Sequence, residues 1–182
     1  KIWKPILNYA ENRGVKIAIE NCPMLFTEDE WPGGKNLAIS PAIWRELFKR
    51  FPSDMLGLNF DPSHFIWQEM DYIKPLYEFK DKIFHVHYKD IKVNKDARNE
   101  VGILATPLSY MLPCIPGHGD VDWAEYIRAL LEIGYKGAAC IEIEDKSFEN
   151  DKESIENSLK ISRQYLKQFI NFPEKGKKYE KD

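Results

Sequence analysis

Short hydrophobic runs alternate along the chain with longer segments in which hydrophobic residues recur at helical spacing. The runs predict four strands, over residues 15–20, 55–60, 82–87 and 137–144. The longer segments predict helices over residues 1–14, 40–51, 63–80, 122–134 and 151–170. Because a helical segment separates each strand from the next, we expect right-handed βαβ units and a parallel α/β sheet.

Local signals mark the ends of several predicted helices. The first helix ends at Gly14, the usual left-handed stop, and the second begins with Ser40 as a cap and Pro41 in its first turn. Asp122 and Glu125 are spaced like a capping box. The helix that follows them has a predicted apolar face formed by Trp123, Tyr126, Ile127, Leu130 and Leu131.

Composition indicates one globular domain, over residues 1–172, followed by a charged tail over 173–182. A chain of 182 residues with 43% hydrophobic content can bury a sizeable core. Its net charge of −3 gives no broad basic field, so nucleic acid is disfavoured as a partner. No apolar run approaches the roughly 20 residues of a membrane helix, and no signal peptide is evident. Three widely spaced cysteines favour a reducing compartment, and we expect a cytoplasmic protein without a membrane partner.

Ionisable residues gather where the predicted strands end. The first strand ends at Glu20, the second runs into Asp61, the third ends at His87, and the fourth carries Glu142 and Glu144. In parallel α/β folds, chemistry gathers at the carboxyl ends of the strands. Neighbouring carboxylates repel one another unless a cation neutralises them. Three carboxylates and one imidazole suit Mn²⁺, Mg²⁺ or Co²⁺, with Zn²⁺ as a further choice.

Each of these residues also has a structural interpretation. A single carboxylate at a strand end is more often a helix cap or a salt-bridge partner, and Asp61 before Pro62 fits the N-cap of the next helix. His85 faces the same side as His87 and is interpreted as a structural histidine. Cys22 and Cys140 are interpreted as small buried residues, with Cys114 the third unpaired cysteine. A metal site is favoured only because ionisable residues occur together at the ends of all four predicted strands.

Five motifs carry a resemblance to a known family: IAIENCP, LGLNFDPSH, FHVHYKD, PGHGDVDW and GYKGAACIEIED. Their order and spacing resemble the sugar isomerase/epimerase superfamily with the xylose-isomerase-like TIM barrel, over roughly residues 1 to 170. The resemblance implies a TIM (β/α)8 barrel of which this chain covers about the C-terminal four βα units. The chain is then either a fragment, which we favour because open sheet edges are a liability, or a half that assembles with a second copy.

The resemblance also implies roles for individual residues. Metal coordination is implied for Glu20, Asp61, His87 and Glu142. Substrate binding is implied for His64, which contacts a hydroxyl, and for Lys89 and Asp90, which form part of the pocket rim. Glu20 and Glu142 are in addition the implied catalytic acid and base.

The implied reaction is isomerisation or epimerisation of a sugar or sugar phosphate. A proton leaves the carbon next to a carbonyl, a metal stabilises the resulting enediolate, and carboxylates move the proton. Inosose-type dehydration uses a similar arrangement, so the expected partner is a sugar or cyclitol. A non-catalytic half-barrel binding module stays open as a third interpretation, as do inactivity of the isolated fragment and assembly into a homo-oligomer.

Type IV apurinic-site endonucleases share this barrel but require a further D-x-H pair of zinc ligands. Those positions correspond to Met111 and Pro113 here, which disfavours the nuclease, and His118 is interpreted as a surface or rim residue. The segment 88–121 is longer than ordinary βα connections and is predicted to be a lid or substrate loop. A solvated charged loop is favoured over a phosphate site for its basic residues Lys92, Lys95 and Arg98.

Overall fold

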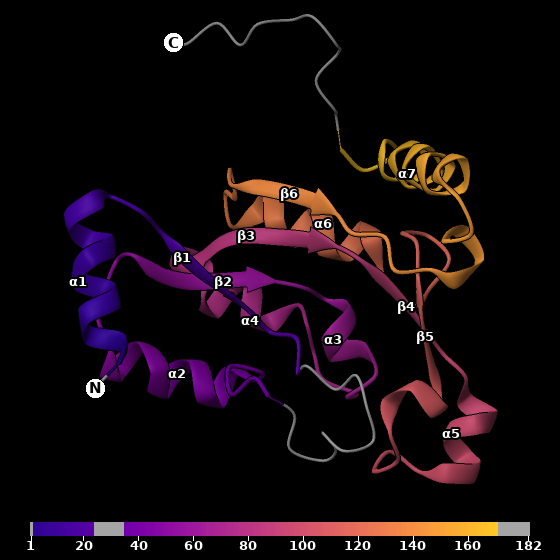
Figure 1. Ribbon diagram of the computed structural model, residues 1–182, viewed down its shortest axis with the longest axis horizontal. Helices are drawn as coiled ribbons and strands as arrows, with labels where there is room; N and C mark the ends of the chain where they lie inside the picture. Colours follow the sequence, from indigo (N-terminus) through magenta and orange to yellow (C-terminus); the bar gives the residue numbers. More distant parts are fainter. Residues whose placement is uncertain (1, 24–34, 171–182) are drawn as a thin grey trace, which may run out of the picture.

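The computed structural model describes residues 2–23 and 35–170 of this chain. Four strands form a parallel sheet in the order β1, β2, β3, β6 (Figure 1). Their bounds are β1 Ile17–Glu20, β2 Leu56–Phe60, β3 Ile83–Tyr88 and β6 Ala138–Ile141. The structure confirms the four predicted strands and the parallel α/β architecture, and the last strand ends just before Glu142.

Each segment predicted to be helical contains a helix, and one further α-helix, Lys95–Val101, lies in segment 88–121. The α-helices are α1 Trp3–Arg13, α2 Pro41–Arg50, α3 Ser63–Ile66, α4 Lys74–Glu78, α5 Lys95–Val101, α6 Trp123–Glu132 and α7 Lys152–Leu166. The 3-10 helices are η2 Lys80–Lys82, η3 Pro107–Ser109 and η4 Lys146–Phe148. Gly14 ends α1 with a φ of 62°, and the Asp122 side chain caps α6 by accepting from Glu125 N. Ser40 precedes α2 without making the expected side-chain cap bond.

An aromatic core lies between one face of the sheet and helices α2, α4 and α6. Trp44 of α2 is fully buried at its centre. Its ring meets those of Phe60, Phe65 and Phe79 at centroid distances of 6.0, 5.7 and 5.2 Å, each edge to face. Such pairs add to the stabilisation that burial of large rings already provides. This packing fixes the helical side of the sheet.

Strand alternation places polar side chains on the opposite face of the sheet. Phe60 and Val86 are fully buried in the aromatic core. Because side chains alternate along a strand, their neighbours Asn59, His85 and His87 face the other way, and all three are partly exposed. The polar face therefore carries the residues at the carboxyl ends of β2 and β3.

The segment 88–121, predicted to be a lid or substrate loop, contains a second, two-stranded sheet. Strands β4 Asp90–Val93 and β5 Met111–Cys114 pair antiparallel, with α5 and η3 between them. The sequence does not reveal this pairing, because Asp90 pairs with the distant Cys114 and no short hairpin turn marks it. A separate buried cluster formed by Trp67, Ile91, Val93 and Tyr110 anchors this unit.

The two outer strands of the parallel sheet each have one neighbour among the described residues. On β6, Ala138, Ala139 and Cys140 are exposed, so the interpretation of Cys140 as a buried residue was wrong.

In the two stretches that the structure describes, no helix is long and apolar enough to cross a membrane. The predicted charged tail, residues 173–182, lies outside the described residues.

One helix offers a matched test of the core. Ile127 and Leu131 of α6 were both expected on its apolar face, but Ile127 is 2% exposed and Leu131 is 65% exposed. We expect Ile127→Ala to lower the free energy of unfolding by about 2–5 kcal/mol. Leu131→Ala should change it by less than about 0.5 kcal/mol. Urea unfolding of the two variants measures both values, and equal losses would contradict the observed packing.

Candidate metal centre

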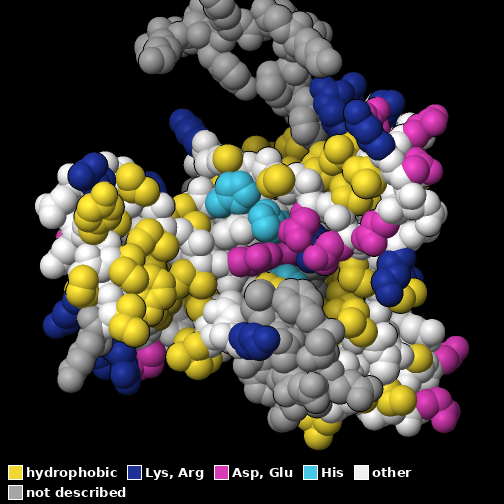
Figure 2. Space-filling model, viewed as in Figure 1, with side chains coloured by type: hydrophobic (Ala, Val, Ile, Leu, Met, Phe, Trp, Pro, Cys, Tyr) yellow, Lys and Arg dark blue, Asp and Glu magenta, His cyan; other side chains and the backbone are white. Residues whose placement is uncertain are grey.

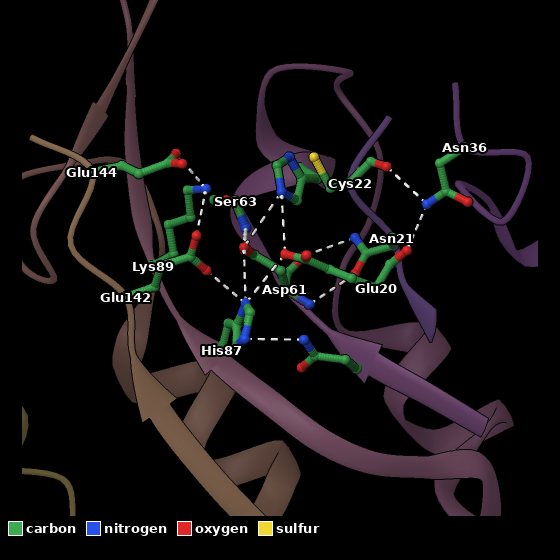
Figure 3. A network of polar contacts seen from close by, with 12 residues as sticks. Glu20, Asn21, Cys22, Asn36, Asp61, Ser63, His87, Lys89, Glu142 and Glu144 are labelled. Atoms are coloured by element: carbon green, nitrogen blue, oxygen red, sulfur yellow. Dashed lines mark hydrogen bonds and ion pairs between the residues drawn. The ribbon is translucent and has the colours of Figure 1, made fainter. Parts of the chain in front are cut away.

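Four side chains converge from the carboxyl ends of the four parallel strands (Figure 3). Glu20 ends β1 and His87 lies near the end of β3, while Asp61 and Glu142 directly follow β2 and β6. The parallel register brings the four positions to the same edge of the sheet: Glu20 lies opposite Asn59 and His87 opposite Cys140, which are two residues before Asp61 and Glu142. One ligand atom from each residue lies within 4.8 Å of the corresponding atom of every other. The structure thus brings together the four residues that the sequence nominates as ligands.

His87 is the centre of this group. Its Nδ1 lies 2.6 Å from Glu142 Oε2, 3.2 Å from Glu20 Oε1 and 3.9 Å from Asp61 Oδ2. Burial acts to lower the pKa of His87, but hydrogen bonds to Glu142 and Glu20 outweigh it and raise the pKa to about 10. Burial conversely acts to raise the pKa of both glutamates, and the histidine contacts hold those pKa values below their usual range. Both glutamates are therefore ionised at neutral pH.

The two oxygens of Asp61 have different surroundings. Oδ1 accepts a hydrogen bond of 2.8 Å from Ser63 N, which is the capping role expected from the sequence. Oδ2 is buried without a hydrogen bond, and the two imidazole nitrogens beside it, His64 Nε2 and His87 Nδ1, are 3.5 and 3.9 Å away. Burial raises the pKa of Asp61, because an unsatisfied carboxylate oxygen is costly to bury. A divalent cation beside Oδ2 would satisfy it, so the donor set fits a metal.

Asn21 holds Asp61 in place, a role that the sequence did not reveal. The Asn21 side chain donates to Asp61 O and accepts from Asp61 N, both at 2.8 Å. Asn36 similarly donates to the carbonyl oxygens of Glu20 and Cys22, at 2.7 and 2.8 Å. These side-chain amides bond to backbone groups at the ends of β1 and β2, where hydrogen bonding between the two strands stops. The only sign of this role in the sequence is that Asn21 directly follows Glu20 at the end of a predicted strand.

Lys89 supplies a fixed positive charge beside the carboxylates. Its Nζ lies 2.6 Å from Glu144 Oε2 and 3.2 Å from Glu142 Oε1, and the residue is 5% exposed. Burial acts to lower the pKa of Lys89, but the charge of Asp61 and of both glutamates raises it above its usual range. Glu144 was not nominated from the sequence, although its spacing of two from Glu142 was visible there.

His64 faces the same group from α3. Its Nε2 lies 3.5 Å from Asp61 Oδ2 and 3.7 Å from Glu20 Oε1. Burial acts to lower the pKa of His64, and the charge of Asp61 outweighs it and raises the pKa to about 10. A protonated imidazole in this position can donate to a substrate oxygen, which suits the role implied for it.

A cavity of about 190 Å³ opens beside the carboxylates. Its polar side is formed by Glu20, His64, Lys89, Glu142 and Glu144. Its apolar side includes Trp67, Ile91, Leu108, Met111 and Pro113. Acidic and histidine side chains gather at the middle of the face seen in Figure 2. The segment 88–121 therefore builds a wall of the cavity, and the two positions of the nuclease D-x-H pair carry apolar side chains there.

Asp90 lies outside the cavity lining, contrary to its expected place at the rim. It is fully buried, and Oδ1 accepts from Ile91 N and Val121 N at 2.9 and 3.1 Å. Oδ2 accepts from Gly117 N and Trp123 Nε1 at 2.9 and 2.8 Å. Four protein donors use both oxygens, so we assign Asp90 to holding the PGHGDVDW segment against β4.

Lys92, Lys95 and Arg98 of segment 88–121 lie away from the cavity lining. Lys92 pairs with Asp120, and Arg98 lies 2.5 Å from Glu69. Lys95 is exposed, and so is His118, whose ring is 6.2 Å from that of Phe148. The solvated-loop interpretation of these side chains agrees with this placement.

Residues 1–167 match the family described as "Xylose isomerase-like TIM barrel". The chain belongs to this family. Among curated relatives, the inosose dehydratase of Lactiplantibacillus plantarum is 29% identical over 119 residues, 64% of this chain and 38% of the relative. The uncharacterized protein YfiH of Bacillus subtilis is 29% identical over 178 residues, 93% of this chain and 51% of the relative.

Solved structures agree with this assignment of the fold. The IolI protein with a bound zinc atom matches with a TM-score of 0.66 and 20% identity, over 94% of this chain and 56% of that chain. A D-tagatose 3-epimerase-like protein matches with a TM-score of 0.57 and 26% identity, over 90% and 54%. This protein spans about half the length of these chains and of YfiH, and 38% of the length of the inosose dehydratase.

The structural role of Asp90 can be tested by an isosteric change. Asp90→Asn places an amide N–H₂ against buried donors, so we expect the free energy of unfolding to fall by at least about 2 kcal/mol. Mn²⁺ affinity, measured on the folded variant, should change less than about threefold, because Asp90 faces away from the cavity. Asp96→Asn, at an exposed position of α5, is the matched control. A variant of full stability that loses Mn²⁺ would refute this role.

The two histidines predict how stability depends on pH. Their folded pKa values of about 10 exceed the ordinary histidine value of 6.5, so their contribution to stability is complete below pH 6.5 and is lost as the pH rises through 10. In EDTA, the urea midpoint should therefore fall over this range, and less steeply for His87→Gln. Saturating Mn²⁺ should reverse the trend, because metal binding requires deprotonated His87. A midpoint in EDTA that stays constant would contradict the raised pKa values.

Proposed function

We propose that this protein is a divalent-metal-dependent sugar or sugar-phosphate isomerase or epimerase. The observation that supports it is the convergence of four donor atoms within 4.8 Å of one another, at neighbouring strand ends. They lie beside a cavity that also presents His64 and Lys89. The family includes epimerases, and one matching structure is a D-tagatose 3-epimerase-like protein.

The metal would be held by Glu20, Asp61, His87 and Glu142. Bound there, a divalent cation supplies Lewis-acid polarisation of the substrate's carbonyl and hydroxyl oxygens. Three carboxylates and one imidazole suit Mn²⁺ best, with Mg²⁺, Co²⁺ and Zn²⁺ as alternatives. The similar IolI structure contains zinc, which makes Zn²⁺ the first alternative to test.

Glu20 and Glu142 would move the proton. Both are ionised at neutral pH, because the histidine contacts hold their pKa values low. Either carboxylate can therefore accept a proton from the carbon next to the carbonyl. In isomerisation the resulting carboxylic acid returns the proton to the carbonyl carbon, while the hydroxyl proton passes to the former carbonyl oxygen. In epimerisation the opposite glutamate takes a proton from water and donates it to the other face of the same carbon, and the first glutamate releases its proton to water.

The remaining cavity residues would bind and orient the substrate. Protonated His64 donates to a hydroxyl, and Lys89, held by Glu144, donates to a second oxygen. The apolar side chains of Trp67 and Met111 form the opposite wall. A wall of this kind excludes water from the reacting carbon and strengthens the charge interactions around it.

An inosose-type dehydratase is the second candidate, supported by the inosose dehydratase relative. Dehydration begins with the same removal of a proton next to a carbonyl. It then breaks a bond to the neighbouring hydroxyl, which leaves as water after receiving a proton. The two candidates differ in the product, because dehydration lowers its mass by one water and isomerisation leaves the mass unchanged.

Proton exchange in D₂O tests both candidates. The protein with Mn²⁺ is incubated with ketoses, ketose phosphates and inososes, and NMR follows deuterium entering the carbon next to the carbonyl. Glu20→Gln and Glu142→Gln should each slow exchange by at least about 100-fold, with the exposed Glu100→Gln as control. Metal content is measured for every variant, because both glutamates are also proposed ligands.

The outcomes separate the interpretations. Exchange without loss of water supports the isomerase or epimerase, whereas a dehydrated product supports the second candidate. Tight Mn²⁺ binding with no exchange on any substrate would replace the enzyme with a binding role. Unchanged exchange in both glutamine variants would remove Glu20 and Glu142 as acid and base.

A further inference from the structure

Asn59 joins the two histidines of β3 behind the proposed metal site. On β2 it lies opposite Glu20 of β1 and opposite His85 of β3. Its Nδ2 lies 3.0 Å from His87 Nε2, and its Oδ1 lies 2.8 Å from His85 Nδ1. The three side chains therefore form one chain of polar contacts that ends at the ring of a proposed ligand.

In His87, the choice of the nitrogen that binds a metal also decides which nitrogen carries the proton. Nδ1 faces the carboxylates, so it is the nitrogen that would bind a metal there. A neutral imidazole has one N–H and one bare nitrogen, so metal at Nδ1 leaves the proton on Nε2. That N–H requires an acceptor, as metal-bound histidines generally have. The Asn59 atom that faces Nε2 is the amide nitrogen, which only donates.

A half-turn of the Asn59 amide resolves this conflict. The turn exchanges Oδ1 and Nδ2, which have nearly the same shape and position. Oδ1 then accepts from His87 Nε2–H, and Nδ2 donates to His85 Nδ1. His85 can accept there when its own proton lies on Nε2. Both contacts of the Asn59 amide then join a donor to an acceptor.

We propose that Asn59 is the positioning residue for His87: its Oδ1 accepts from His87 Nε2–H when Nδ1 binds the metal, and His85 holds the amide in that orientation. The inference rests on the proposed metal site and adds two residues to it. His85, interpreted from the sequence as structural, thereby acts on the metal ligand through Asn59. Fixing the ring and its tautomer in this way is worth about 10–100-fold in metal affinity.

Mn²⁺ binding to matched variants provides the first test, with free Mn²⁺ measured by electron paramagnetic resonance. Asn59→Leu removes the acceptor and should weaken binding about 10–100-fold. Asn59→Asp keeps an acceptor at the same distance and should bind at least as tightly as the unsubstituted protein. Asn99→Leu, on the exposed face of α5, is the control and should change nothing. Equal affinity of Asn59→Leu and the unsubstituted protein would overturn the proposal.

NMR of the unsubstituted protein provides a second readout, which needs no variant to fold. With ¹⁵N-labelled histidine and Zn²⁺ bound, His87 should carry its proton on Nε2 and His85 should have a bare Nδ1. A proton on Nδ1 of His85 in the loaded protein would contradict the proposed orientation. This measurement also separates the acceptor role from the added negative charge of Asn59→Asp.

The result for the unsubstituted protein distinguishes this inference from the proposed function. If that protein binds neither Mn²⁺ nor Zn²⁺, the metal-dependent function and the role of Asn59 are both wrong. If it binds the metal and Asn59→Leu binds it equally well, the proposed function stands and the role of Asn59 falls. Weak binding by Asn59→Leu, tight binding by Asn59→Asp and a bare His85 Nδ1 would together support the proposal.

Discussion

Mutual repulsion among carboxylates is the constraint on which this site depends. Glu20, Asp61 and Glu142 all approach one atom, His87 Nδ1, and Asp61 is fully buried. Like charges this close are tolerated only where positive charge or hydrogen bonds offset them. His87, His64 and Lys89 supply that charge, which explains why the pKa of each of these three residues is raised. The same requirement makes the group suited to a divalent cation.

Strand alternation places the residues of the FHVHYKD motif on two opposite faces. His85, His87 and Lys89 are two residues apart, so they share the polar face of the sheet. Asp90 follows Lys89 and points the other way, where its oxygens meet four protein donors. The motif thus contributes one proposed ligand, one fixed cation and one structural carboxylate. Lys89 and Asp90 were both expected at the pocket rim, but adjacent side chains of an extended chain point in opposite directions.

The described half of the barrel contains the whole proposed ligand set and one wall of its cavity. The ligands come from four parallel strands, and the apolar wall comes partly from the β4–β5 unit. The chain spans about half the length of the structures it resembles. The proposed ligands and the apolar wall of the cavity therefore come largely from different elements.

The sequence by itself determined the four strands, most helices and the four converging residues, because hydrophobic periodicity and strand-end positions are local properties. Only the tertiary structure decided the β4–β5 pairing and the roles of Asn21, Asn59, Glu144 and Asp90. Asn21 meets Asp61 across 40 positions of sequence, and Asn59 meets His87 across 28. The sequence around an amide or carboxylate does not indicate which distant residue it will contact. Its role follows from which strands lie side by side and at what register.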